Sequence, residues 1–514
     1  MVLIITVAVL LILIYYYGTR NYTYWSKRGI KHDRPIPYLG TAKRQLFFQT
    51  SQFEIFEEMY WKYPQEKYVG YYYGTTPLII LRDPELVRRF LATDFSHFYS
   101  RSMVPLHGKP EPIMNNLFSC EGNLWRFLRQ KMTHAFSSAK LRAMYPLIIS
   151  RTDKLRQLAT EASLKGTEVD VRELMARYTT DFIGACGFGL DPEALNDENS
   201  LFSRVGHRIF HTTIRDAVVM FCKIMMPGLF KNFHYWPEFV EKNMFKLVDG
   251  IIAQRGHKSS GRNDFIDLLL EAKERGDSSG CTSFEANLSE TPRLEDLKLT
   301  EELMAAQVFV FFAAGFETSS NSSSYMLHEL AHHPEYQKKC QEEIDEVLAR
   351  YDNKLCYDAV NEMKFLAMCY SESLRIFPAG GLLIRKCEKP YVIPGTDINL
   401  DPGVKVVVPV RALHRDPLYW EDPEEFRPDR FHTDNMAKIN NNIYLPYGDG
   451  PRRCIGERLG VMQSLAGLAA VLSEFSVAPG KSTVRHPPLD PSVFLVQSVI
   501  GGLPLMLHPR KKNL

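Results

Sequence analysis

The sequence predicts a mainly α-helical protein with small β-sheets, arranged as one large domain behind an N-terminal membrane anchor helix. Helical periodicity dominates on both sides of a polar stretch at 276–299, which is expected to be a surface loop, and the strand-like pieces are few and short. These two observations predict the domain. The anchor is predicted by a third, because residues 2–17 are apolar except for Thr6.

The composition is typical of a packed globular chain. Hydrophobic residues make up 45% and charged residues 24% of the 514, which excludes a disordered chain and a polytopic transporter. The 62 basic residues nearly cancel the 60 acidic ones, so bulk charge gives no reason to expect nucleic-acid binding. Nine cysteines with no CxxC pair argue against a disulfide framework and against a thiolate zinc site.

The N-terminal segment is predicted to be a retained anchor at residues 1–19. As a helix, residues 2–17 cover about 25 Å, slightly short of a hydrocarbon core. A cleaved signal peptide would have a basic start and small residues before the cut, and this segment has neither. Aromatic residues that follow are expected to form an interfacial belt, namely Tyr15, Tyr16, Tyr17, Tyr22, Tyr24 and Trp25.

Residues 20–40 are predicted to be a basic, proline-containing linker to a catalytic domain at 41–514. Basic residues outnumber Asp33 there, so the positive-inside rule predicts a lumenal N-terminus and a cytosolic body. Glycosylation sequons at Asn21 and Asn287 therefore serve as a test of topology, because a cytosolic body would not meet the glycosylation machinery.

Within the body, three segments have strand-like patterns: 68–82, 405–409 and 493–507. An apolar patch from Gly228 to Pro237 is consistent with two interpretations, a segment that dips into the membrane surface and the end of a core helix.

A glycine-pinned loop from Tyr447 to Gly456 presents Cys454 directly before a helical pattern at 457–475. Amide N–H groups and the helix N-terminus favour thiolate over thiol at this position and so favour metal ligation. Gly456 leaves room for a flat cofactor, and Arg452 could reach an anionic group on it, as a haem propionate would require. An ordinary buried cysteine is the alternative, but the combined pattern is rare by chance.

A second candidate is the apolar stretch 303–316, expected to be a helix buried on every side after an N-cap at Thr300. It turns polar at Ala314-Gly315-Phe316-Glu317-Thr318-Ser319, which could hold a small ligand in a groove and pass protons to it. A tightly packed helix with Thr318 bonded back to a carbonyl explains the same residues equally well.

Two further motifs differ in what they predict. Glu372 and Arg375 form an i,i+3 pair that gains weight from Arg430, since a second arginine could complete a buried structural cluster. His328-Glu329-Leu330-Ala331-His332 matches the zinc-peptidase pattern H-E-x-x-H, with a third ligand to be sought among Glu342, Glu343 and Glu346. Pro334 breaks the helix just after His332, which weakens the zinc interpretation.

Taken together, the residues from about Pro35 to Leu507 resemble the cytochrome P-450 superfamily of haem-thiolate monooxygenases. The cysteine loop resembles F-x-x-G-x-R-x-C-x-G with Tyr447 in place of Phe, and 314–319 resembles A-G-x-[DE]-T-[TS]. Glu372 and Arg375 fit E-x-x-R, residues 428–431 fit P-E-R-F with Asp429 for Glu, and 125–129 looks like W-x-x-x-R. In this arrangement H-E-x-x-H falls on the last turn of the oxygen-binding helix.

The resemblance implies a cytochrome P-450 fold and roles for the matching positions. Cys454 would be the proximal ligand of the iron of haem b, and Thr318 and Glu317 would hold the distal oxygen and supply protons. Four residues would bind haem propionates, with Arg101 as a fifth partner: Arg452, Arg129, Trp125 and Arg385. Gly456 and Ala314 would border the haem.

The same resemblance, closest to insect microsomal members that metabolise xenobiotics, implies a substrate pocket and partners. Pocket residues would include Phe309, Phe312, Ala313, Ala379, Leu382, Leu383, Val493 and Phe494, within a lining that also takes in the loop 103–118. Such a lining favours a lipophilic substrate. No dinucleotide fingerprint occurs in the chain, so an NADPH-cytochrome reductase is expected, with cytochrome b5 as a further partner, at the endoplasmic reticulum membrane.

The expected docking face for that reductase is basic: Arg126, Lys131, Lys140, Arg142 and Arg453. A haem-thiolate isomerase or sensor that does not use O2 stays open beside the monooxygenase, and the Glu-Thr pair at 317–318 favours oxygen chemistry.

Overall fold

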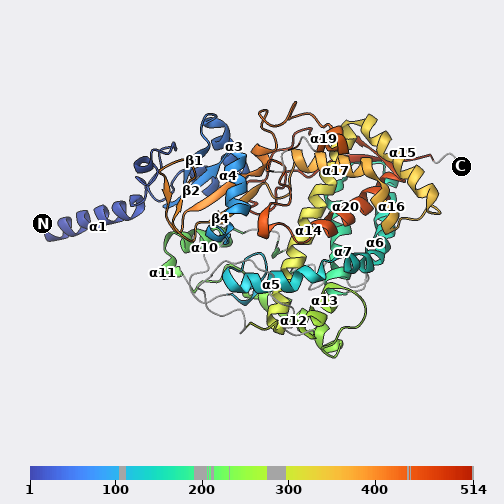
Figure 1. Cartoon of the computed structure of the whole chain (residues 1–514), viewed down its shortest axis with the longest axis horizontal. Coiled ribbons are helices and arrows are strands. Elements are labelled where there is room, and N and C mark those ends of the chain that lie inside the picture. The colour runs from blue at the N-terminus through green and yellow to red at the C-terminus, as the bar shows by residue number, and fades with distance from the viewer. Residues whose placement is uncertain are drawn as a thin grey trace.

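The computed structural model describes residues 1–102, 111–189, 205, 208–209, 213–230, 232–274, 297–436, 439 and 442–511. Most of the predicted surface loop, the sequon at Asn287 and residues 103–110 of the predicted pocket loop lie outside these ranges. Helices predominate and β-strands are short, so the predicted fold class is confirmed (Figure 1).

Helices form most of the body and the N-terminal extension. They are α1 (Val2–Thr19), α2 (Lys43–Leu46), α3 (Gln52–Lys62), α4 (Pro84–Arg88), α5 (Gly122–Ala135), α6 (Ser138–Leu164), α7 (Val171–Ile183), α10 (Ile214–Met225), α11 (Pro227–Phe230), α12 (Glu238–Gln254), α13 (Phe265–Glu274), α14 (Glu301–His332), α15 (Pro334–Arg350), α16 (Tyr357–Glu362), α17 (Lys364–Ile376), α18 (Val410–Leu413), α19 (Thr433–Met436) and α20 (Glu457–Leu472).

In the residues that the structure describes, the strands form three small sheets. They are β1 (Tyr68–Tyr73), β2 (Thr76–Leu81), β3 (Val169–Asp170), β4 (Leu382–Lys386), β5 (Tyr391–Val392), β6 (Asn399–Leu400), β7 (Lys405–Pro409), β8 (Phe475–Pro479) and β9 (Pro504–Pro509). The four-stranded sheet has the order β1-β2-β7-β4, in which only β2 and β7 are parallel. The other two sheets are β3-β9-β8 and β5-β6.

Helix α14 runs through the helical half of the molecule, where it packs against α7, α12, α17 and α20 (Figure 1). The predicted N-cap is confirmed, since the Thr300 side chain accepts a hydrogen bond from the Leu303 N–H. Residues 304–309 and 325–331 pack into the largest hydrophobic core, and His332 is the last residue of the helix. The H-E-x-x-H motif therefore occupies the final turn of this helix, as expected. Most residues from 310 to 318 are only partly buried, so the prediction that 303–316 is buried on every side was wrong.

Two of the three strand predictions are confirmed. Residues 68–82 contain the β1-β2 hairpin and 405–409 form β7. Within 493–507, however, only the last residues enter a strand, β9, because β9 finds its partners in β3 and β8, far away in the sequence. The helix predicted at 457–475 ends at Leu472, since Phe475 begins β8 in the same sheet.

Alternating side chains of the four-stranded sheet serve two separate cores. Ile79 and Leu81 pack with Trp25 and Phe90 on one face, whereas Leu78 and Ile80 pack with α3 on the other. The α3 face is the one that borders the cavity described below.

The predicted anchor is a helix, α1, which extends away from the body with its apolar side chains exposed (Figure 1). It is long and apolar enough to cross a membrane. The prediction that Trp25 belongs to the interfacial aromatic belt was wrong. Trp25 is fully buried and donates its indole N–H to the Tyr71 carbonyl at 3.1 Å. Gly70 makes this possible, because a Cβ at Gly70 would overlap the indole ring.

The apolar patch between Gly228 and Pro237 divides between the two predicted roles. Leu229 is 75% exposed and Phe233 52% exposed, whereas Trp236 packs against the main core and lies 5.5 Å from the ring of Phe309. The exposed part follows α10, whose Phe221 lines a groove with Leu13 and Tyr38. The exposed apolar end of this segment therefore lies near α1.

Candidate functional site

The cysteine loop ends directly at α20, and its glycines fit the predicted role. Gly448 and Gly450 have φ angles of +71° and +68°, which glycine adopts without strain. A Cβ on Gly450 would overlap the carbonyl oxygen of Leu91. The Cys454 N–H donates to the Tyr447 carbonyl at 2.9 Å and closes the loop.

Arg452 is 3% exposed and points from this loop into the segment before α5. Its guanidinium donates to three backbone carbonyls, those of Tyr99, Leu117 and Cys120, at 3.0, 3.3 and 2.9 Å. It also lies 4.2 Å from the centre of the Trp125 ring. Arg452 thus ties the cysteine loop to the chain around α5 and leaves two of its five N–H donors for another acceptor.

Three further arginines gather around the loop. Arg101 donates to the carbonyls of Phe118 and Arg452 at 3.1 and 3.0 Å, and Arg129 donates to the Arg453 carbonyl at 2.9 Å. Arg385, on β4, donates to the Ile384 carbonyl, but its Nε is buried and has no hydrogen-bond partner. A buried donor without an acceptor is costly and indicates where an anion would fit.

The electrostatics of this arginine cluster also favour the binding of an anion. Burial, together with the nearby charge of Arg101, lowers the pKa of Arg385 to about 9. Burial also lowers the pKa of Arg101 to about 10. The carboxylates of a haem would supply the absent negative charge, so the four arginines fit the propionate end of such a cofactor.

Among the eight cysteines in the described ranges, Cys454 is the most accessible, yet the protein surrounds its side chain closely enough for desolvation to dominate its pKa. The sequence predicts a thiolate favoured by amides and by the helix N-terminus, yet the pKa of Cys454 is raised. Burial is the largest influence on it, while the Gly456 N–H, Arg101 and Arg129 lower it. Desolvation outweighs these groups, and a bound cation would reverse that balance by coordinating the sulfur.

Gly456 and Ala314 fit a flat group beside the cysteine. Gly456 has an ordinary φ of −87°, and a Cβ there would meet only Phe136, at 3.9 Å. Neither backbone strain nor a close protein neighbour therefore requires glycine at this position. Ala314 is exposed and its neighbours Ala313 and Gly315 are only partly buried, so α14 also presents an open face there.

Thr318 and Glu317 differ in how their side chains are used. The Thr318 hydroxyl donates to the Ala314 carbonyl at 2.6 Å, which is the back-bonded alternative, although its oxygen can still accept a hydrogen bond. Glu317 lies 3.3 Å from Arg172 of α7, which in turn donates to Asn321 at 3.1 Å. Burial raises the pKa of Glu317 to about 7 against the pull of Arg172.

Arg172 was missed by the sequence reasoning. It is separated from Glu317 by 145 residues, and no local pattern marks it. Only the packing of α7 against α14 brings the two side chains together.

A cavity of about 720 Å³ opens beside Glu317 and is lined mostly by apolar side chains. Of the predicted pocket residues, Phe309, Ala313, Val493 and Phe494 line it. The remaining four do not belong to this lining: Phe312, Ala379, Leu382 and Leu383. Phe312 is buried against Phe188, with ring centres 5.8 Å apart, because the helical period turns it away from the Phe309–Ala313 face.

Other parts of the cavity wall come from segments that carry no motif. They include Phe47, Phe56, Ile214, Met220, Tyr235 and Lys405. Of these residues, Lys405 could have been noticed in the sequence, because it is a charged residue at the start of the otherwise apolar strand β7.

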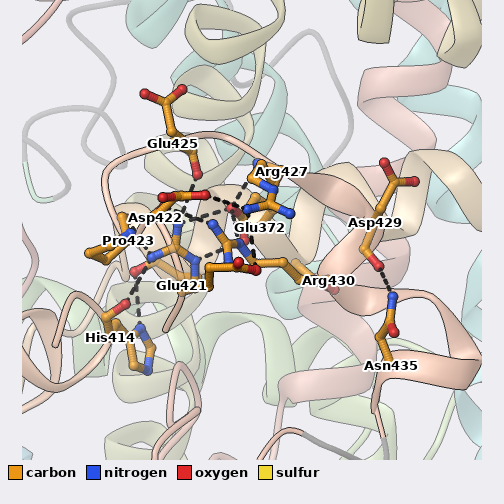
Figure 2. A network of polar contacts seen from close by, with 12 residues as sticks. Glu372, His414, Glu421, Asp422, Pro423, Glu425, Arg427, Asp429, Arg430 and Asn435 are labelled. Atoms are coloured by element: carbon orange, nitrogen blue, oxygen red, sulfur yellow. Dashed lines mark hydrogen bonds and ion pairs between the residues drawn. The ribbon is translucent and has the colours of Figure 1, made fainter. Parts of the chain in front are cut away.

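The predicted ion cluster of Glu372, Arg375 and Arg430 is brought together at the end of α17 (Figure 2). Glu372 and Arg375 are both fully buried, with two contacts of 2.8 and 2.9 Å, and Arg430 reaches Glu372 at 3.3 Å. Arg375 also donates to the carbonyls of His414, Pro423 and Glu425. The cluster fastens the chain that leads to the cysteine loop onto α17.

The H-E-x-x-H side chains are engaged in other contacts. His328 Nε2 lies 3.1 Å from the Arg485 carbonyl, and Glu329 pairs with Arg485 at 2.8 Å. Of the proposed third ligands, Glu343 accepts two backbone N–H groups, while Glu342 and Glu346 pair with Lys338 and Arg350. No group of three His, Cys, Asp or Glu side chains suited to a metal occurs in the portion of the chain that the structure covers.

Comparison with known proteins gives matches along nearly the whole chain. A family model described as Cytochrome P450 matches residues 31–502. The chain is 35% identical over 508 residues to "Cytochrome P450 6B6" of Helicoverpa armigera, with 98% of each chain covered. It is 33% identical over 519 residues to "Cytochrome P450 6a2" of Drosophila melanogaster, again with 98% of each covered. Identity to "Cytochrome P450 6B1" of Papilio polyxenes is 33% over 494 residues.

Proposed function

Because the chain belongs to the cytochrome P450 family of haem monooxygenases, we propose that it inserts one oxygen atom of O2 into a lipophilic small molecule held in the 720 Å³ cavity. The substrate class is a xenobiotic, such as a plant toxin or an insecticide, or an endogenous lipid or hormone. The observation that carries the proposal is the convergence of Arg101 and Arg129 on the loop of Cys454, with Arg101 also lining this apolar cavity.

The proposed cofactor is haem b. Cys454 would ligate its iron, Arg101, Arg129, Arg385 and Arg452 would bind its propionates beside Trp125, and Gly456 and Ala314 would border its plane. Bound there, the haem would supply oxygen activation with two electrons delivered from outside. The unpaired Nε of Arg385 and the open space beside Gly456 support this placement.

Glu317 is proposed to deliver protons and Thr318 to orient them. A carboxyl with a pKa of about 7 is protonated in a large fraction of molecules near neutral pH and can release that proton. Arg172 would hold the resulting carboxylate, since it already lies 3.3 Å away. The Thr318 oxygen, one residue on, would accept a hydrogen bond while its own hydroxyl keeps donating to the Ala314 carbonyl.

The cavity wall would orient the substrate and exclude water. Phe309 and Ala313 of α14 face it from the side of Glu317, and Val493 and Phe494 close it from the segment before β9. An apolar lining of this kind favours a lipophilic molecule and strengthens the polar interactions inside.

The electrons are proposed to come from an NADPH-cytochrome reductase, with cytochrome b5 as a second donor. The basic residues expected at the docking face are Arg126, Lys131, Lys140, Arg142 and Arg453. Arg126 and Lys131 lie on α5, which also carries Trp125 and Arg129. Because α5 contributes residues to the proposed haem site, we centre the proposed docking face on α5.

We further propose that residues 1–19 anchor the protein in the endoplasmic reticulum membrane with the N-terminus in the lumen. The exposed side chains of Leu229 and Phe233, near α1, would then rest on the membrane surface. Residues 20–40 would serve as a packed junction to the domain at 41–514, since Trp25 and Ile30 are buried.

The carbon monoxide difference spectrum of the reduced protein in membranes tests the proposed function. The wild type should give the red-shifted Soret band of a thiolate-ligated haem, and Cys454→Ser should lose it while keeping its fold. Cys387→Ser, at a buried cysteine directly after β4, is the matched control and should keep the band. A folded, haem-supplemented wild type without the band would contradict the proposal.

A further inference from the structure

Lys405 places a positive charge in the wall of the cavity. It is the first residue of β7, where it lies opposite Leu78 of β2 and Lys386 of β4. Leu78 and Ile384, on the same face of the sheet, line the cavity together with Lys405. The ammonium group therefore belongs to the sheet side of the cavity, whereas Ala313 and Glu317 belong to the α14 side.

Lys405 makes no hydrogen bond or ion pair with any residue that the structure describes. The carboxylate that influences it most is Glu121, and both oxygens of Glu121 are engaged: one accepts the Ser102 N–H at 2.9 Å and the other lies 3.6 Å from Lys386. Lys386 also binds Glu388 at 2.9 Å. Burial lowers the pKa of Lys405 to about 8, as expected for an ammonium held away from water without a counter-charge.

The other charged side chains of the lining are already matched. Asp216 binds Arg208 at 2.8 Å, Glu317 binds Arg172, and Arg101 donates to two carbonyls. Within the described part of the wall, Lys405 is thus the charged group that still lacks a partner. An anion beside it would recover the cost of desolvating the ammonium.

We propose that Lys405 binds the carboxylate of an amphipathic acid, such as a long-chain fatty acid, and so selects and orients the substrate of this cavity. The hydrocarbon part would lie along the apolar wall toward Ala313, which directs oxidation to carbons remote from the carboxylate. The proposal rests on the monooxygenase function proposed above. A haem propionate offers the same carboxylate chemistry, so the experiment has to separate the two sources.

Equilibrium dialysis of the full-length haem protein in detergent, with radiolabelled dodecanoate and its methyl ester, measures the effect directly. Lys405→Met should weaken dodecanoate binding about 10- to 100-fold and leave methyl dodecanoate unchanged, because only the acid uses the charge-assisted hydrogen bond. Lys405→Arg should keep most of the affinity for the acid. Lys386→Met removes the cross-strand lysine that does not line the cavity, and it should keep the wild-type preference.

Retained binding of the ester shows that a variant is folded, and Lys405→Gln provides a second neutral side chain if methionine disturbs the sheet. Unchanged dodecanoate affinity in the neutral variants, or no binding of dodecanoate to the wild type, overturns the proposal. The proposal is also overturned if the neutral variants lose haem and bind dodecanoate and its methyl ester equally less well. In that case Lys405 binds a haem propionate and not the carboxylate of the substrate. A wild type that lacks the carbon monoxide band but binds the acid through Lys405 contradicts the monooxygenase function alone.

Discussion

Burial shifts the pKa values of several side chains around the site in the direction that favours their uncharged forms. It raises the pKa of Cys454 and Glu317 and lowers that of Arg385 and Lys405. Glu317 already has Arg172 beside it, whereas Cys454, Arg385 and Lys405 gain when a partner of opposite charge arrives, whether iron for the sulfur or a carboxylate for the cations. The site is thus electrostatically prepared for a cofactor and a ligand.

Glu317 should make the stability of the protein pH-dependent. The pKa of Glu317 is about 7 in the folded chain and 4.5 normally, so folding favours its protonated form. The free energy of unfolding is therefore highest below pH 4.5 and falls as the pH rises through 7. Glu317→Gln should therefore gain up to about 3 kcal/mol relative to the wild type between pH 4.5 and pH 8. Urea unfolding at pH 5 and pH 8 measures the difference.

Arg172 provides the control for this effect. Because Arg172 lowers the pKa of Glu317, Arg172→Met should shift the loss of stability to higher pH in the wild type, with no such shift in the Glu317→Gln background. A difference between wild type and Glu317→Gln that does not change with pH would mean that the carboxyl is not held in a desolvated state.

Thr318→Ala should separate NADPH consumption from product formation. Loss of the hydroxyl removes a hydrogen-bonding group beside the proposed proton donor, so product per NADPH should fall about tenfold or more while hydrogen peroxide rises. The matched control is Ser322→Ala, one turn later, whose hydroxyl donates to the Thr318 carbonyl at 2.8 Å. An isomerase or sensor that does not use O2 predicts unchanged behaviour for Thr318→Ala.

At the scale of secondary-structure elements, the sequence predicted the features that depend on neighbouring residues and not those that depend on distant partners. The Thr300 cap, β7 and the glycine loop depend on neighbouring residues and were found from local patterns. The end of α20 and the start of β9 depend on partners far along the chain, so their predicted bounds were wrong. For the same reason, motifs located Cys454 and Glu317, while Arg172 and most of the cavity wall required the fold.

The cluster at the end of α17 should be sensitive to the loss of one charge. Glu372→Ala leaves Arg375 fully buried without its counter-ion, which should destabilise the protein by about 3–5 kcal/mol. Arg427→Met removes a partly exposed pair with Asp422 at 2.7 Å from the same region and should cost about 1 kcal/mol or less. Haem retention during thermal unfolding compares the two, and equal losses would contradict a structural role for Glu372.

On the scale of the whole molecule, α1 and the exposed end of the α10–α11 region lie at the same end of the protein (Figure 1). If α1 crosses the membrane, the body is held close to the surface, because Trp25 and Ile30 pack into the domain soon after the helix ends. The short packed junction leaves the domain little freedom to rotate relative to α1. Insertion of α1 into the membrane would therefore also fix which side of the domain faces the lipid.

The proposed topology predicts which asparagines carry glycans. With a lumenal N-terminus, Asn21 and Asn287 stay unmodified in microsomes, whereas a sequon added before Met1 on a short tag is glycosylated. The fold agrees for Asn21, whose side-chain amide donates to the Thr75 carbonyl at 2.9 Å and would lose this contact if a glycan were attached. Mobility after glycosidase treatment, with and without the tag, measures this, and protease protection of the tag alone provides the control. A glycan on Asn287 would place the body in the lumen, away from a cytosolic reductase, and would contradict both the orientation and the proposed electron supply.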